Sequence, residues 1–172
     1  MNEQKTKDFF EALRKKSAEI TEDVVLEVDG DGEYTLRTGF TTVKGGGGAC
    51  LFETEVYEAW ENEPQVEIVV TAQFEIDPDS MEDFEEAIMN INLFTPIGYF
   101  GIYYPMDQMY FRYTGFLDAA EDADEMAAAV YHLFELIAMV VGNVHDSLER
   151  IATGASTYDA EVEKGILATQ GE

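Results

Sequence analysis

The longest helical pattern in the chain lies between Glu121 and Ile151. Apolar residues recur there at three- and four-residue spacing over about eight turns, as on one face of a helix. They are Met126, Val130, Leu133, Phe134, Ile137, Val140, Val141, Val144, Leu148 and Ile151. Asp122 and Glu125 match a capping box, and Gly154 can end the helix. So broad an apolar face must be covered, and we expect the aromatic segment just before it to cover it.

Within the long helical pattern, the run Met126–Val144 is long enough to cross a bilayer, but three polar residues interrupt it: His132, Glu135 and Asn143. Each would cost on the order of a few kcal/mol in the hydrocarbon region. The first sixteen residues are polar and amphipathic and have no apolar signal segment. The single cysteine fits a reducing compartment. We therefore expect a buried helix in a cytoplasmic protein, with no membrane partner.

The 172 residues carry a formal net charge of −26. Five of the ten basic residues lie in residues 1–16, so the acidic excess is concentrated in the rest of the chain. This charge argues against direct binding of nucleic acid or anionic lipid. A solvated surface is the simplest explanation. An acidic face for a basic partner, a nucleic-acid mimic and a halophilic or acid-adapted proteome remain open.

The patterns in the rest of the chain predict short helices and extended segments. A turn at Asp29–Gly32 joins the first two strands into a hairpin. The segment Val66–Ile76 alternates apolar and polar residues, which predicts a strand with one buried face. The expected elements, in order, are a helix over Thr6–Ile20, strands over Val24–Val28, Glu33–Val43, Ala49–Trp60 and Val66–Ile76, and a helix that starts near Asp77–Asp79 and ends by Thr95.

Eight aromatic residues are concentrated between Ile97 and Leu117, and a turn at Pro105–Gln108 divides them between two strands. The pattern predicts two faces. One face pairs Tyr104 with Met109, Ile102 with Phe111, and Phe100 with Tyr113; the other pairs Tyr103 with Tyr110, Gly101 with Arg112, and Tyr99 with Thr114.

The first of these faces is the more apolar, so we expect it to pack on the long helix. The second face is rich in tyrosine and carries one arginine, which is typical of protein interfaces. We take this second face as the candidate partner-binding site: Tyr99, Tyr103, Tyr110, Arg112 and Thr114. Ordinary surface tyrosines on a wet sheet are the alternative.

The sequence shows no constellation of catalytic or metal-ligating residues. It has no His-x-x-x-His or Cys-x-x-Cys spacing and no Gly-x-Ser-x-Gly elbow. The run Asp29–Glu33 lacks the glycine and the final acid of a calcium loop, and Lys44–Gly48 places its lysine before the glycines, unlike a phosphate loop.

The isolated histidines and the cysteine have structural interpretations. We expect His132 to be a core or boundary residue, and His145, near a helix end, to be favoured as a cation by the dipole. Cys50 is expected in the core. We therefore expect no catalytic residues, no cofactor, no metal and no enzymatic activity.

The order of helix, antiparallel strands, helix, two strands and long helix resembles the type III secretion chaperone-like fold and, within it, the YbjN-type domains. The similar stretch is FEEAIMNINLFTPIGYFGIYYPMDQMYFRYTGF followed by the long helix. It has a middle helix ending in an apolar segment with Asn90 and Asn92, then an aromatic strand, a short turn and a return strand. The resemblance covers about Ser80–Ile151. The family has about three strands before the middle helix, whereas this chain has four extended segments.

The resemblance implies an α+β fold of order α-β(3-4)-α-β-β-α, with helices packed on one face of an antiparallel sheet. We expect one domain over residues 1–152 and a flexible or loosely docked tail over residues 153–172. The resemblance also implies a small acidic bacterial protein that binds peptides or proteins along its sheet and helix surfaces.

We therefore expect a non-enzymatic protein- or peptide-binding module, chaperone-like or regulatory, that forms a homodimer. One alternative is an acidic decoy for a basic nucleic-acid-binding protein, which predicts salt-sensitive binding. Another is a small-ligand sensor or enzyme with a pocket under the aromatic ribbon, lined by tyrosine, methionine and convergent polar groups.

Overall fold

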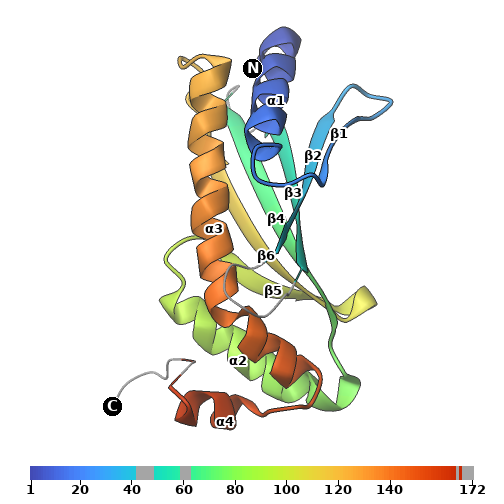
Figure 1. Cartoon of the computed structure of the whole chain (residues 1–172), viewed down its shortest axis with the longest axis vertical. Coiled ribbons are helices and arrows are strands. Elements are labelled where there is room, and N and C mark those ends of the chain that lie inside the picture. The colour runs from blue at the N-terminus through green and yellow to red at the C-terminus, as the bar shows by residue number, and fades with distance from the viewer. Residues whose placement is uncertain (42–48, 59–62, 166, 168–172) are drawn as a thin grey trace. The chain divides into compact units, whose positions relative to one another are not determined.

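The computed structural model describes residues 1–41, 49–58, 63–165 and 167. These residues form a mixed α+β fold with four α-helices and a six-stranded antiparallel sheet of order β1-β2-β3-β4-β6-β5 (Figure 1). The elements are α1 (Glu3–Ser17), β1 (Val24–Val28), β2 (Tyr34–Thr41), β3 (Ala49–Glu58), β4 (Pro64–Glu75), α2 (Met81–Phe94), β5 (Tyr99–Tyr103), β6 (Gln108–Phe116), α3 (Ala123–Ala152) and α4 (Tyr158–Glu163). The expected α+β class is confirmed, with four strands before α2.

The chain divides into two compact units, and several elements contribute to both. The first unit comprises Met1–Phe40, Leu51–Val70 and Tyr113–Ile137, and the second comprises Thr41–Cys50, Thr71–Arg112 and Ala138–Glu172. The lysine-glycine segment Lys44–Gly48 lies outside the described residues.

In the first unit, α1 begins and ends three residues before the predicted helix. Asn2 caps it, because its side-chain oxygen accepts a hydrogen bond from the backbone N–H of Lys5 at 2.8 Å. Ile20, predicted to lie near the apolar face, is beyond the helix and exposed. The buried face of α1 carries Phe9, Phe10 and Leu13.

The predicted hairpin is confirmed as β1 and β2, with Val28 opposite Tyr34. In its turn, the Asp29 carboxylate accepts hydrogen bonds from the backbone N–H groups of Asp31 at 2.8 Å and Glu33 at 2.9 Å. Asp29 therefore stabilises the turn locally.

The first unit also contains the start of α3, where the capping box is confirmed. Asp122 Oδ1 accepts from the Glu125 backbone N–H at 2.9 Å. Buried Phe134 of this helix meets Phe52 of β3 edge-on, with ring centroids 5.7 Å apart. The next strand in the sheet is β4. The predicted apolar face is buried along this strand and at the residue directly after it: Val66, Ile68, Val70, Ala72, Phe74 and Ile76.

The core of the second unit centres on Phe74. Its ring meets Phe84 of α2 at 6.2 Å and His145 of α3 at 5.4 Å between centroids. The predicted apolar face of α2 is confirmed, since Phe84, Ala87, Ile88 and Ile91 are all buried. The helix ends at Phe94, and its C-cap Thr95 is extended before a proline, as expected.

Residues 153–172, expected to be flexible or loosely docked, include α4, which lies beside α2 (Figure 1). Glu161 of α4 is fully buried. It accepts hydrogen bonds from Arg150 at 2.6 Å, Lys164 at 2.8 Å and Ser147 at 3.0 Å. The bonds from Arg150, above all, hold the pKa of this carboxyl well below its ordinary value of 4.5. The sequence pattern did not indicate this cluster.

By length and composition alone, α3 could cross a membrane. A single helix of this kind is weak evidence, because the core helices of soluble proteins pass the same test. In this structure one stripe of α3 is buried against protein, through Phe134 in the first unit and Val141 and Leu148 in the second.

Candidate protein-binding face

The ribbon of β5 and β6 has a register different from the predicted one. Phe100 lies opposite Phe111, and Tyr99 lies opposite Arg112. The difference arises at the turn: a 3-10 turn over Tyr104–Met106 is followed by Asp107 at φ +47°. The pairs are therefore offset by two positions from those expected. An offset of two preserves the alternation of a strand, so the predicted division of β5 into two faces holds.

The second face of the ribbon displays tyrosines, as predicted. The side chains of Tyr99 and Tyr103 on β5 are 44% and 53% exposed. The ring centroids of Tyr99 and Tyr110 are 6.3 Å apart, and the two ring planes are inclined at 77°. We use the name tyrosine face for Tyr99, Tyr103, Tyr110 and Arg112.

Gly101 allows the ring of Tyr110 to lie across β5. A Cβ at this glycine would be 2.4 Å from Cζ of Tyr110. The two residues are opposite each other in the register, so the ring covers the space that a side chain would fill. This close approach explains how Tyr110 reaches the ring of Tyr99.

Thr114 does not join the tyrosine face in the predicted way. It was expected opposite Tyr99, but Arg112 occupies that place. Thr114 is exposed on β6, outside the described β5–β6 pairs, and belongs to the first unit. The predicted pair is therefore wrong because the turn sets a different register.

The opposite side of the ribbon is apolar and buried, as predicted, at Phe100, Met109 and Phe111. Tyr104 was expected on this side and is instead exposed in the turn. Its hydroxyl donates a hydrogen bond to Glu85 of α2 at 2.9 Å. This hydrogen bond raises the pKa of Tyr104.

Asn92 of α2 blocks the outer edge of β5 at Phe100. Its side-chain oxygen accepts from the backbone N–H of Phe100 at 2.7 Å, and its Nδ2 donates to the carbonyl of Phe100 at 2.9 Å. Since β5 is the last strand of the sheet, these are the groups that an added strand would use. The sequence showed Asn92 only as part of the family resemblance, without this role.

An apolar groove of about 340 Å³ lies in the second unit. Its lining comprises Ile91, Phe94, Thr95, Pro96, Phe100, Met139, Val140, Asn143, Val144 and Leu167. Phe100 of β5 and four residues of α3 line this groove together. The polar side chains in this lining are Thr95 and Asn143, and none of the lining residues is a tyrosine.

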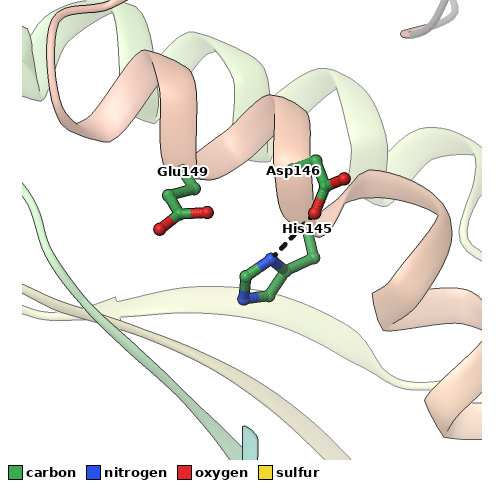
Figure 2. A group of neighbouring side chains, drawn as sticks. All are labelled: His145, Asp146 and Glu149. Atoms are coloured by element: carbon green, nitrogen blue, oxygen red, sulfur yellow. Dashed lines mark ion pairs between the residues drawn. The ribbon is translucent and has the colours of Figure 1, made fainter. Parts of the chain in front are cut away.

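Three neighbouring side chains of α3 could hold a metal ion: His145, Asp146 and Glu149 (Figure 2). One ligand atom from each lies within 4.8 Å of the others. His145 Nδ1 is 3.5 Å from a carboxylate oxygen of Asp146, close enough for an ion pair if the ring is protonated. That contact lacks hydrogen-bond geometry, and neither ring nitrogen has a hydrogen-bond partner in the described part of the chain.

The structure adds the burial of one histidine and contradicts the predicted environment of the other. His145 is buried between α3 and Phe74, because it continues the helical stripe between Val141 and Leu148. His132, predicted in the core or at its boundary, is exposed, with Nδ1 3.0 Å from Glu135. His132 lies outside the row of buried residues on α3, so the helical spacing alone would have predicted its exposure.

Cys50 is buried, as predicted for a small core residue. Burial raises the pKa of its thiol to about 11. The thiol is therefore protonated at neutral pH, which makes it a poor nucleophile.

A scan against protein-family models finds no match for this chain, and a search of curated proteins finds no matching relative. The YbjN-type resemblance therefore depends on the order of elements and the residues quoted above.

Proposed function

We propose that this chain is a non-enzymatic protein- or peptide-binding module of YbjN type, chaperone-like or regulatory, that works as a cytoplasmic homodimer. The tyrosine face is the observation that carries the proposal. It displays two exposed tyrosines on one short strand, with a third ring held across Gly101. Tyrosine gives a large, amphipathic contact area and has few rotatable bonds to immobilise on binding.

The closed edge of β5 favours side-chain packing over strand addition as the mode of binding. A partner strand would have to displace the two hydrogen bonds between Asn92 and Phe100. A partner packing on Tyr99 and Tyr103 leaves those bonds intact. We therefore infer that partners contact the tyrosine rings.

The proposed chaperone-like topology is supported by the element order. A helix precedes the strands, α2 separates β4 from the β5–β6 hairpin, and α3 follows. The additional strand before α2 is a departure from the family pattern. The apolar groove lacks the tyrosines and the several convergent polar groups expected for the small-ligand alternative.

A double variant, Tyr99→Ser with Tyr103→Ser, tests the proposal. We expect the self-association constant, measured by light scattering over a range of concentrations, to fall about tenfold or more, since interface tyrosines are common binding hot spots. Circular dichroism should be unchanged because both side chains are exposed. The matched control is Tyr57→Ser, an exposed tyrosine of the first unit that contacts Glu67 at 3.4 Å.

Equal association of the double variant and the wild type would overturn the assignment of the face. A wild-type chain that stays monomeric at every concentration would overturn the homodimer. Repeating the titration at high salt separates the acidic-decoy alternative, because charge-driven binding weakens with salt whereas aromatic contacts persist.

A further inference from the structure

His145 is an unusual residue to find in the core of the second unit. Its side chain is 1% exposed, yet neither ring nitrogen has a hydrogen-bond partner among the described residues. Buried polar atoms are nearly always satisfied, by protein, water or a bound ion. An apolar residue at this position would avoid the cost, so the imidazole calls for an explanation other than packing.

The unsatisfied Nδ1 points toward the carboxylate of Asp146, 3.5 Å away. Figure 2 shows the ring below the helix with Nδ1 directed at Asp146, and the carboxylate of Glu149 on the neighbouring turn. Asp146 is half-exposed and Glu149 is exposed, so both can be reached from solvent. The spacing of His145 and Glu149, four residues apart on a helix, places both on the same face.

We propose that His145 Nδ1 and the carboxylates of Asp146 and Glu149 form a binding site for a divalent transition-metal ion of the Zn²⁺ class. Ligand atoms around tetrahedral zinc lie about 3.4 Å apart, given metal–ligand bonds of about 2.1 Å. Here one ligand atom from each of the three residues lies within 4.8 Å of the others, and Nδ1 of His145 lies 3.5 Å from an oxygen of Asp146. The remaining contraction falls on Asp146 and Glu149, whose exposed side chains can rotate while the buried imidazole stays fixed.

The donor set determines the class of cation. An imidazole nitrogen favours zinc, iron, nickel or copper, whereas magnesium and calcium prefer oxygen ligands alone. Three protein ligands leave at least one position of a tetrahedral ion for water. The acidic chain attracts any cation in a diffuse way, but only this cluster in the described structure joins a buried imidazole to two acids.

We expect modest affinity. Metal-binding histidines usually donate their second N–H to an acceptor, and Nε2 of His145 has none among the described residues. Loss of such a partner typically weakens binding by about 10–100-fold. This site is independent of the tyrosine face, so the failure of one proposal would not affect the other.

The experiment titrates Zn²⁺ into the full chain by isothermal titration calorimetry, with excess Mg²⁺ present to occupy diffuse acidic sites. We expect one equivalent to bind to the wild type. Two variants, His145→Phe and Glu149→Gln, should each weaken binding about tenfold or more. Glu149 is exposed, so this second variant tests the site even if the core substitution disturbs folding. Co²⁺ absorption gives a second measure of tetrahedral ligation.

The chain supplies its own matched control. His132 and Glu135 form an exposed histidine–acid pair on the same helix, with Nδ1 and the carboxylate 3.0 Å apart. His132→Phe should bind Zn²⁺ as the wild type does. The proposal is overturned if His145→Phe and Glu149→Gln retain wild-type affinity, if His132→Phe is the variant that loses binding, or if Mg²⁺ displaces Zn²⁺ completely.

Discussion

The side-chain amide of Asn92 takes the place of a neighbouring strand at Phe100. It accepts from the backbone N–H and donates to the carbonyl of that one residue, at 2.7 and 2.9 Å. An amide is the only ordinary side chain that offers a donor and an acceptor in this planar arrangement. The outer edge of the last strand is thereby blocked at this residue, while Tyr99 and Tyr103 remain exposed.

Replacing Asn92 by alanine should destabilise the protein and open the edge. Two hydrogen bonds to a half-buried backbone are lost, and we expect a fall of about 1–3 kcal/mol in the free energy of unfolding. The exposed N–H and C=O of Phe100 should then favour self-association through β5. Urea denaturation and light scattering measure the two effects.

Asn92→Asp is the matched control for that variant. Aspartate can accept from the Phe100 N–H but cannot donate to its carbonyl, so the stability should lie between wild type and alanine. An alanine variant as stable as the wild type would show that the two hydrogen bonds between Asn92 and Phe100 contribute nothing to the free energy of unfolding.

Gly98, just before β5, and Gly101 within it should respond differently to replacement by alanine. At Gly98, φ is +62°, and a Cβ would lie 2.4 Å from the ring of Phe111 and 2.6 Å from a backbone carbonyl. We expect Gly98→Ala to lower the free energy of unfolding by about 2 kcal/mol, because of backbone strain and overlap with atoms that cannot move away.

At Gly101 the obstructing atoms are the far end of the Tyr110 side chain, which can swing outward. Gly101→Ala should therefore stay within about 1 kcal/mol of the wild type. It should still weaken association, because Tyr110 leaves the tyrosine face. Urea denaturation and light scattering separate stability from association. A large stability loss at Gly101 would show that the ring of Tyr110 is held in place.

The Glu161 cluster should make stability depend on pH in the acid range. The pKa of this carboxyl is lowered in the folded chain, mainly by Arg150. Its stabilisation is therefore complete above the ordinary value of 4.5 and is lost as the pH falls below it.

A glutamine at position 161 removes the charge and leaves two cations without their partner. At pH 7 we expect Glu161→Gln to lower the free energy of unfolding by about 2 kcal/mol. This is less than the loss expected on breaking a fully buried ion pair, because the side chain of Arg150 is part-exposed. The difference from wild type should shrink between about pH 4.5 and 3. Denaturation at several pH values measures it, and a constant difference would exclude this linkage.

The buried faces of β4 and α2 could be predicted because periodicity alone sets them. The register of the ribbon could not, because it depends on a 3-10 turn and on Asp107 in a left-handed conformation. A shift of two positions leaves the alternation intact, so the tyrosine face was identified while its cross-strand pairs were wrong.

The polar contacts of the second unit could not be predicted from sequence patterns, for a different reason. Glu161 meets Arg150 across eleven residues, and Asn92 meets Phe100 across a turn. Neither spacing belongs to a helix or a strand, so only the tertiary fold brings these groups together. His145, in contrast, could have been found from the helical stripe that it shares with Val141 and Leu148.

His145→Phe should stabilise the protein when metal is removed. The ring is buried against Phe74, with centroids 5.4 Å apart, and a phenyl ring of similar shape would keep that contact. It would also remove two unsatisfied nitrogens from the core. We expect a gain of about 1 kcal/mol in the free energy of unfolding in the presence of a chelator. Added Zn²⁺ should reverse the order of stability, because only the wild type gains from binding. Urea denaturation of both proteins with chelator and with Zn²⁺ measures these differences. A variant less stable than the wild type in chelator would show that the imidazole nitrogens are already satisfied in the metal-free protein.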